Sequence, residues 1–327
     1  MLIAGDIGGT KTDLAIFSSE AGPHAPLARI KVHSADYPSL QVIVKDFLAK
    51  TQKPVDRACF AVAGPVIGGR VKTTNLPWVI EEHSLAEELK LKPHSVRLIN
   101  DLEAVARAIP ILRPSDVETI NPGEPEPHGA IAVIAPGTGL GESFLTWDGS
   151  SYLAHGSEGG HSDFAPTGES QIRLLEYMLK KSGHVSYEKV CSGLAVPNIY
   201  GYFRDVERIP EEAAVSSSIE SAADKTATIV EHAFGPNRSK LCATTIDTFV
   251  SILAAEAANL TLKVLATGGV YIAGGVAFHT LEAIRRPAFM ESFKRKGRFA
   301  DLVGRIPIHV VVSQAGLAGA AAYGLQP

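Results

Sequence analysis

The sequence predicts an α/β protein with two domains. Short apolar runs typical of strands alternate along the chain with stretches whose apolar residues recur at helical spacing. Glycine-rich turns stand at the ends of several of these strands. The chain has 327 residues, which is more than one hydrophobic core usually organises. We therefore expect two domains of mixed helices and strands.

The N-terminal part of the chain predicts a sheet that begins with a hairpin. Residues 2–5 predict one strand and residues 13–17 a second, and the glycine-rich turn 6–12 joins them. Apolar residues at helical spacing predict a helix over residues 40–50. The other elements expected here are strands at 29–32, 58–63 and 96–99 and a helix at 102–108.

The segment 110–130 is rich in proline and glutamate and predicts the boundary between the domains. The order of the N-terminal part then recurs, with a strand at 130–135, a glycine and threonine turn at 136–141 and a strand at 142–146. The later elements expected are helices at 169–182, 245–266 and 315–325 and strands at 270–273 and 308–312. The apolar face expected for the first of these helices contains Ile172, Leu175, Met178 and Leu179.

Composition excludes several classes of protein. The formal net charge is −4, so the chain has no broad electrostatic attraction for nucleic acid or an anionic membrane. Cys59, Cys191 and Cys242 are odd in number and far apart, which fits neither a disulfide framework nor a CxxC-type zinc site. The N-terminus has no signal-peptide pattern, and no run approaches ~18 uninterrupted apolar residues. We expect a cytoplasmic protein.

Three groups of glycines predict contacts with phosphate. They are the segments 5–12 and 137–141 and the pairs Gly268-Gly269 and Gly274-Gly275. Glycine lets backbone N–H groups approach an anion, and the threonines add hydroxyl donors. Two such turns that face each other would clamp a polyphosphate, and Asp6 beside the first turn would hold Mg²⁺ through water. The alternative is that these glycines only make tight hairpin turns.

Two common nucleotide motifs are absent from the sequence. The chain has no GxxxxGK[ST], which excludes a P-loop protein. Gly137, Gly139 and Gly141 form GxGxG and not GxGxxG, because position 142 is Glu, and strand-like sequence follows where a helix would be needed. A dinucleotide-binding dehydrogenase is therefore a poor fit.

Asn100 and Asp101 follow an apolar strand, at the end where α/β proteins bind ligands. A carboxylate there can accept the proton of a hydroxyl that attacks phosphorus, and the amide can bind further hydroxyls. The alternative is that Asp101 only caps the helix that starts at Leu102.

The run Glu158-Gly159-Gly160-His161 places a carboxylate and an imidazole on a glycine loop, which suits hydrogen bonding to vicinal hydroxyls. A metal site of His155, Glu158 and His161 is the alternative. However, the run is not HExxH, and it is too rich in glycine for the helix that such a zinc site needs. Glu188 taken alone is only a surface carboxylate.

Seven motifs carry a family resemblance. They are GDIGGTKTDLAIF (5–17), AVAGPVIGGRVKTTNLPW (61–78), LINDLEAVARAIP (98–110), APGTGLGESFL (135–145), GSEGGHSDFAP (156–166), GHVSYEKVCSG (183–193) and GGVYIAGGVA (268–277). In this order they resemble the bacterial glucokinase family, a hexokinase-type group in the actin-like ATPase and sugar kinase superfamily that is related to the ROK kinases. The resemblance extends over nearly the whole chain and implies two actin-like (ribonuclease H-like) domains with a central cleft.

The resemblance also implies a domain layout and a reaction. The small domain would comprise residues 1–110 and the C-terminal helix 313–327, and the large domain residues 111–312. The implied reaction is transfer of the terminal phosphate of MgATP to the 6-hydroxyl of D-glucose. Glucose and ATP are the expected partners, and similar enzymes are commonly homodimers.

The same resemblance implies site residues. Asp101 would be the general base for the 6-hydroxyl. The residues implied to bind the sugar are Asn100, Asp101, Glu158, His161 and Glu188. Those implied to bind the nucleotide are Asp6 on the Mg²⁺ side, Gly8, Gly9, Thr10 and Lys11 in the first phosphate loop, Thr138 and Gly139 in the second, and Gly274 and Gly275 beside adenosine. No residue is implied to ligate Mg²⁺ directly.

Departures from the family pattern and alternative functions also follow from the sequence. ROK kinases carry a cysteine-rich zinc motif after the EGGH-type segment, but no cysteine lies between Cys59 and Cys191 here, so no structural zinc is expected. Lys11 stands where related glucokinases often have Asn.

A kinase for mannose, fructose or an N-acetylhexosamine would share the hydroxyl-binding residues. A sugar-sensing regulator would need an N-terminal helix-turn-helix, for which there is no room before Gly5.

Overall fold

The computed structural model describes residues 1–73, 76–236 and 238–326. Residues 74–75 of the motif at 61–78 and residue 327 of the predicted segment 313–327 lie outside the described residues. The chain divides into two compact units. The first comprises Met1–Arg113, Tyr152–Ala154 and Ser313–Pro327, and the second comprises Pro114–Ser151 and His155–Val312.

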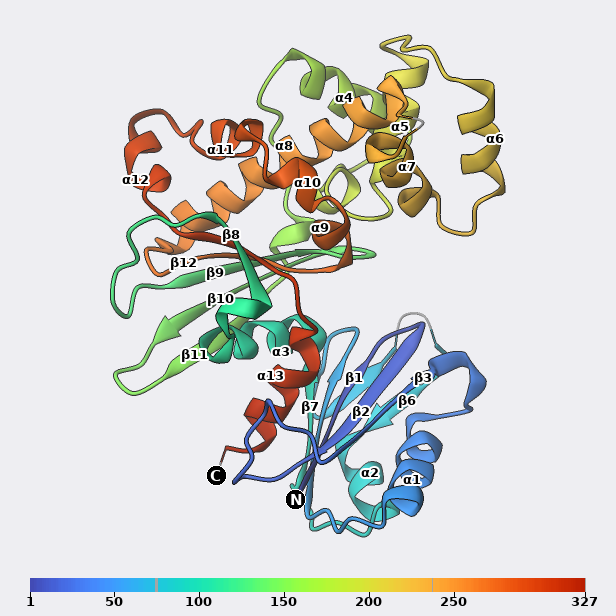
Figure 1. Cartoon of the computed structure of the whole chain (residues 1–327), viewed down its shortest axis with the longest axis vertical. Coiled ribbons are helices and arrows are strands. Elements are labelled where there is room, and N and C mark those ends of the chain that lie inside the picture. Colours follow the sequence, from blue (N-terminus) through green and yellow to red (C-terminus); the bar gives the residue numbers. More distant parts are fainter. Residues whose placement is uncertain (74–75, 237, 327) are drawn as a thin grey trace. The chain divides into compact units, whose positions relative to one another are not determined.

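The first unit is built on a five-stranded sheet with the order β3-β2-β1-β4-β7 (Figure 1). Its strands are β1 (Leu2–Ile7), β2 (Lys11–Phe17), β3 (Ala28–His33), β4 (Arg57–Val62) and β7 (Val96–Asn100). The first three strands pair antiparallel, whereas β4 and β7 run parallel to β1. Parallel neighbours need crossover connections, and these contain α1 (Leu40–Thr51) and α2 (Glu82–Glu88). A separate antiparallel pair, β5 (Arg70–Lys72) and β6 (Val79–Glu81), lies in the second crossover.

Helices cover both faces of this sheet. Side chains alternate between the faces, so Ile3 packs in a core with α1 and α2, while its neighbour Leu2 packs in another with α3 (Asp101–Ala108) and α13 (Ala315–Gly324). A strand buried on both faces is apolar at nearly every position. Continuous apolar runs therefore identified these strands in the sequence.

A six-stranded sheet with the order β11-β10-β9-β12-β13-β8 belongs to the second unit, except for residues 152–154 of β11. Its strands are β8 (Val117–Asn121), β9 (Ile131–Pro136), β10 (Leu140–Trp147), β11 (Tyr152–Ser157), β12 (Gly269–Ile272) and β13 (Ile308–Val311). As in the first unit, an antiparallel hairpin of two strands, β9 and β10, is followed by a third strand beside it. Two later strands then add in parallel on the other side. The recurring strand, glycine turn and strand of the sequence thus begins the same sheet topology twice.

The second unit also contains nine of the described α-helices. They are α4 (Glu169–Leu179), α5 (Val196–Asp205), α6 (Ala213–Ser221), α7 (Lys225–Phe234), α8 (Lys240–Val264), α9 (Gly275–His279), α10 (Leu281–Ile284), α11 (Pro287–Phe293) and α12 (Ala300–Gly304). Among the described residues, α8 is the one helix long and apolar enough to cross a membrane, but 78% of its most apolar window is buried. It packs against α5, α7, α11 and β9 as the central helix of this unit (Figure 1).

The first glycine turn is shorter than expected. Asp6 lies within β1 and Lys11 begins β2, because the antiparallel ladder continues to the pair Ile7–Thr12. Four strands were not predicted, namely β5, β6, β8 and β11. The residues of β8 and β11 are exposed or only partly buried, so neither strand has the apolar run by which the others were identified.

The buried face of α4 also differs from the expected one. The helix buries Gln171, Leu174 and Met178, while Ile172 and Leu179 are about half exposed. The polar Gln171 is accommodated because its side-chain oxygen accepts a hydrogen bond from the Thr167 N–H at 2.9 Å. The contacts of the helix, and not its apolar residues alone, therefore decided which face is buried.

The close contact between α13 and α3 depends on Gly319. A Cβ atom at this position would collide with the Ala104 carbonyl oxygen. We therefore expect Gly319→Ala to lower the free energy of unfolding by about 1–3 kcal/mol, because the packed backbone of α3 would have to shift to make room for the added methyl group. Urea unfolding midpoints check this. Gly183→Ala is the matched control, since nothing lies within 4 Å of a Cβ there, and it should change stability by less than about 1 kcal/mol.

Candidate functional site

The first unit brings Asp6 and Asn100 to one edge of its sheet. The parallel register pairs Ile7 with Val62 on β4, and Val62 with Asn100 on β7. Strands that run parallel present their carboxyl ends at the same edge, which is where α/β proteins bind ligands. The predicted residues Asp6, Asn100 and Asp101 therefore lie at neighbouring strand ends.

Asn100, and not Asp101, caps the helix that follows. Its Oδ1 accepts hydrogen bonds from the N–H groups of Leu102 at 2.8 Å and Glu103 at 3.3 Å, and its Nδ2 donates to the Gly64 carbonyl at 3.0 Å. The interpretation of Asp101 as the N-cap residue is therefore wrong. The Asn100 amide fits the capping position because its side chain can accept from the first turn and donate backward at once.

Asp101 is the first residue of α3 and is exposed. Its Oδ1 accepts a hydrogen bond from the Leu102 N–H at 2.9 Å. Desolvation by the surrounding protein raises the pKa of this carboxyl, while hydrogen bonds from the Leu102 backbone, its own backbone and the Asn100 side chain oppose that rise. The result is a carboxylate held in place by the helix start and more basic than an ordinary aspartate.

Asp6 is partly buried and carries a strongly perturbed carboxyl group. Its pKa is raised to about 6, chiefly by burial and then by the negative charges of Asp101 and Asp13, while Lys31 opposes the rise. Asp13 itself is paired with Arg29 at 2.6 Å and Lys31 at 3.8 Å. Two carboxylates, Asp101 and Asp13, and one ammonium group, Lys31, thus act on the charge of Asp6, and the carboxylates leave a surplus of negative charge beside it.

The turn between β1 and β2 is fixed by backbone hydrogen bonds. The Gly8 N–H donates to the Lys11 carbonyl at 2.9 Å, and the Ser34 hydroxyl donates to the Gly8 carbonyl at 2.8 Å. The Ser34 N–H donates to the Thr10 carbonyl at 2.9 Å. Gly9 is partly buried, while Thr10 and Lys11 are exposed. The turn thus presents exposed donor groups on a rigid backbone.

In the second unit, the turn between β9 and β10 is joined to two later segments. The Gly137 carbonyl accepts a hydrogen bond from the Gly193 N–H at 2.8 Å. The Leu140 N–H donates to Glu188 Oε2 at 3.0 Å. A Cβ at Gly139 would collide with the Glu188 carboxylate, so this contact requires glycine. Thr138, at the tip of the turn, is exposed.

Gly274 lies against the same turn. Its φ is +91°, and a Cβ there would lie 2.5 Å from the Pro136 carbonyl oxygen, so conformation and space both require glycine. Gly275 follows it, is exposed and has nothing within 4 Å of a Cβ position. Residues far apart in the sequence thus form one glycine-lined surface.

Glu158, His161 and Glu188 lie close together in the second unit. His161 Nε2 is 3.9 Å from Glu158 Oε2, and His161 Nδ1 is 3.9 Å from Glu188 Oε1. His161 lies in the short 3₁₀ helix η4 (Gly159–His161), Glu158 immediately precedes that helix, and Glu188 lies in η5 (Tyr187–Lys189). Glu158 and His161 are exposed and Glu188 is partly buried. The cluster can donate and accept several hydrogen bonds to a polyhydroxyl ligand.

His155 takes no part in this cluster. Its Nε2 is hydrogen-bonded to the Thr146 hydroxyl at 2.8 Å, and its ring stacks on Phe144 with centroids 4.9 Å apart. Within the part of the chain that the structure describes, no three His, Cys, Asp or Glu side chains are arranged to hold a metal ion. The observed contacts place His155 in the sheet and not in a metal site with Glu158 and His161.

Sequence analysis missed a buried polar cluster behind these residues. Glu142 in β10 and Glu256 in α8 are 1% and 0% exposed, and Tyr187 and Asn259 belong to the same cluster. A signal was present, because Glu142 and Glu256 are the charged residues within otherwise apolar stretches. Buried carboxyl groups are rare unless they are paired or functional.

Comparison with known proteins gives concordant matches. The family model described as Glucokinase matches residues 3–327. A glucokinase from Nostoc punctiforme is 39% identical over 98% of this chain and 98% of its own. The crystal structure of a glucokinase from an Antarctic psychrotroph has a TM-score of 0.84 at 30% identity, covering 98% of both chains. A ROK family glucokinase from Streptomyces griseus, in complex with glucose and AMPPNP, has a TM-score of 0.66 at 20% identity and likewise covers 98% of both, which shows a shared fold.

The perturbed carboxyl of Asp6 predicts a pH-dependent stability. Its pKa is about 6 in the folded chain and 3.8 ordinarily, so the folded state holds the proton more tightly and loses stability as pH rises between these values. Asp6→Asn has no carboxyl to lose a proton, so its free energy of unfolding does not fall in this way. The difference in free energy of unfolding between the variant and the original chain should therefore be larger at pH 7.5 than at pH 4.5 by on the order of 2 kcal/mol, in favour of the variant. Urea unfolding at both pH values measures the difference. The exposed Asp46→Asn should show no such trend, and an Asp6→Asn difference that stays constant with pH would contradict the assignment.

Proposed function

The chain belongs to the glucokinase family, and we propose that it transfers the terminal phosphoryl group of ATP to the 6-hydroxyl of D-glucose. The products are glucose 6-phosphate and ADP. Relatives named glucokinase at 39% and 30% identity support this reaction. The AMPPNP complex of a protein with the same fold is consistent with a nucleoside triphosphate as donor.

The observation that carries the proposal is the hydrogen bond between Glu188 and the Leu140 N–H. It joins the carboxylate and imidazole cluster, which suits sugar hydroxyls, to the glycine turn, which suits phosphate. In this proposal Glu158, His161 and Glu188 bind sugar hydroxyls, and Thr138 and Gly139 contact the phosphates. One bond therefore ties the groups proposed for the acceptor to those proposed for the donor.

Asp101 acts as the general base in this proposal. Its carboxylate accepts the proton of the 6-hydroxyl while that oxygen attacks the terminal phosphorus and the bond from phosphorus to the ADP oxygen breaks. The raised pKa of Asp101 favours this role, because a more basic carboxylate accepts the proton more readily. Asn100 binds a further hydroxyl and, as the cap of α3, fixes the backbone that carries Asp101.

The nucleotide is assigned to the glycine-rich segments. Gly8, Gly9, Thr10 and Lys11 bind phosphate in the first unit, and the exposed Thr10 and Lys11 supply a hydroxyl and an ammonium group. Gly274 and Gly275 form the surface for adenosine in the second unit, which their exposure and lack of side chains support.

Asp6 fits the Mg²⁺ that accompanies the nucleotide. Its pKa is raised by burial and by neighbouring carboxylates, and a hard cation would relieve that surplus of negative charge. We assign Asp6 a contact with Mg²⁺ through water, because Mg²⁺ retains several of its waters when it binds beside phosphates. When bound, Mg²⁺ neutralises charge on the phosphates.

The proposal extends to the arrangement and location of the enzyme. We assign residues 1–110 with 313–327 to a small domain and residues 111–312 to a large one, which the two compact units support. A homodimer in the cytoplasm completes the proposal, on the strength of the family resemblance.

Replacement of Asp101 tests the reaction and its base together. ADP release from MgATP is measured across a panel of hexoses for the original chain and Asp101→Asn. We expect glucose-dependent release that falls roughly 10²–10⁴-fold in the variant, with glucose affinity by calorimetry little changed. Near-normal turnover in Asp101→Asn would remove it from the base role. Release with another hexose but not with glucose would contradict the assignment of the substrate.

Replacement of Glu158 and of His161 tests the sugar-binding cluster. We expect Glu158→Ala and His161→Ala each to raise the KM for glucose roughly tenfold or more, because each loses hydrogen bonds to hydroxyls worth about 1.5–3 kcal/mol when charged. The KM for ATP should change little. Asp163→Ala is the matched control, because this exposed carboxylate follows the same loop and bonds to His184 at 2.8 Å instead. Unchanged KM values for glucose in both variants would refute the assignment.

A further inference from the structure

Two buried carboxyl groups of the second unit interact with each other, through a hydrogen bond and the repulsion of their charges. Glu142 comes from β10 and Glu256 from α8, and both are almost fully buried. Lys263 Nζ lies 3.2 Å from Glu256 Oε1, and among the described residues it is the one cation within ion-pair distance of either carboxylate. The nearby Lys296 ammonium group donates to Asn259 Oδ1 and to the Ala255 carbonyl instead. One ammonium group in direct contact balances one carboxylate, and an unbalanced buried charge is costly. The pair is therefore expected to keep one proton.

The charged and titratable groups around Glu142 agree with this. Its pKa is raised to about 7 by desolvation first, then by the charge of Glu256 and by a hydrogen bond to it, whereas Lys263 lowers it. The other titratable groups that face the pair are Tyr187, Cys191 and Lys296. Burial raises the pKa of Tyr187 and of Cys191 and lowers that of Lys296, so all three favour their neutral forms more than usual.

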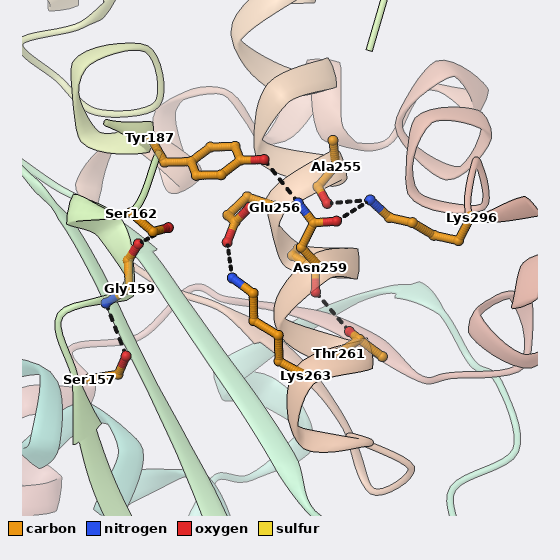
Figure 2. A network of polar contacts seen from close by, with 11 residues as sticks. Ser157, Gly159, Ser162, Tyr187, Ala255, Glu256, Asn259, Thr261, Lys263 and Lys296 are labelled. Carbon is orange, nitrogen blue, oxygen red and sulfur yellow. Dashed lines mark hydrogen bonds and ion pairs between the residues drawn. The ribbon is translucent and has the colours of Figure 1, made fainter. Parts of the chain in front are cut away.

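Glu142 supports the loop that carries Glu158 and His161. A Cβ at Gly159 would collide with the Glu142 carboxylate, and a Cβ at Gly160 would collide with the Leu140 carbonyl. The two glycines thus lie directly against β10. Glu142 Oε1 is buried and has no hydrogen-bond partner among the described residues. Within the loop, the Gly159 N–H donates to the Ser157 hydroxyl at 3.0 Å and its carbonyl accepts from the Ser162 hydroxyl at 2.6 Å (Figure 2).

Glu256 connects to the segment that carries Glu188. Asn259 Nδ2 contacts Glu256 Oε2 at 2.8 Å and the Tyr187 hydroxyl at 2.9 Å (Figure 2). Tyr187 is buried and immediately precedes Glu188. The Lys296 ammonium group also joins this network, because it donates to Asn259 Oδ1 and to the Ala255 carbonyl. The network therefore reaches both 3₁₀ helices of the sugar-binding cluster.

We propose that the Glu142–Glu256 pair, sharing one proton, positions the loop 158–161 and the segment 187–189 for sugar binding. Both are positioning residues, since neither is placed in contact with the sugar. The inference rests on the proposed function for its effect on glucose. Loss of the shared proton leaves two like charges against one ammonium group, which pushes Glu142 away from Glu256 and toward Gly159. Sugar binding then weakens, while the reacting groups of Asp101 and ATP are left as they were.

The kinetic test compares the pH dependence of the KM for glucose between pH 6 and pH 9. In the original chain we expect this KM to rise several-fold above pH 7, with a much smaller change in kcat. Glu142→Gln keeps the shape of the side chain but cannot lose a proton, so its KM should stay within about twofold over the range. Ser143→Ala, another buried change in β10, is the control and should keep the original profile.

Two results would overturn the proposal. One is a Glu142→Gln profile that rises like that of the original chain, which would assign the titration to a group outside the pair. The other is a loss of kcat with an unchanged KM for glucose. If Glu142→Gln fails to fold, Glu256→Gln receives the same measurement, because removal of either carboxyl removes the repulsion.

Hydrogen exchange of the original chain gives a readout that needs neither a variant nor activity. Peptides that cover 157–163 and 185–190 should lose protection at pH 8.5 relative to pH 6.5, after correction for the intrinsic exchange rates. Equal protection at both pH values would refute the pair as a positioning device. If no hexose supports ADP release, the proposed function fails, while this exchange measurement still tests the pair by itself.

Discussion

The hydrogen bond from the Leu140 N–H to the Glu188 carboxylate joins segments that are 48 residues apart in the chain. It is possible only because Gly139 has no side chain, and it brings the β9–β10 turn against η5. His161 completes the arrangement from the other side, 3.9 Å from Glu188. This contact and the two 3.9 Å separations of His161 from Glu158 and Glu188 connect the glycine turn to the imidazole and the two carboxylates.

Close approach of backbone to backbone recurs wherever the candidate site is built. Gly193 contacts the Gly137 carbonyl, and Gly274 lies against Pro136 with a positive φ. In the first unit, Gly319 lets α13 approach the start of α3, the helix that carries Asp101. These glycines do more than make turns. They remove side chains at points where two segments must touch, and so fix the backbone whose N–H groups and side chains remain free for a ligand.

The second unit buries two carboxyl groups that repel each other when both are charged. Glu142 and Glu256 are buried side by side with Lys263 as the paired cation, and hydrogen bonds through Asn259 and Tyr187 lead to Glu188. The first unit has a comparable feature in Asp6, whose neighbours Asp101 and Asp13 are also negative. Natural proteins tolerate such charges mainly where they serve function, and here both lie beside the residues assigned to substrates.

Apolar periodicity and glycine spacing were sufficient to predict the α/β class, the two hairpins, most of the strands and helices such as α1 and α8, because strands buried on both faces and a central helix such as α8 are apolar along their length. The seven motifs identified the family for the same local reason, since each is a short run of adjacent residues. Only the tertiary structure decided that Asn100 caps α3, that α4 buries Gln171 in preference to Ile172, and that β8 and β11 complete the second sheet. It also decided that Glu142 and Glu256, 114 positions apart, form one pair. These features depend on contacts between distant segments. The free energy of such a contact depends on both segments at once, so the residues of either segment alone do not predict it.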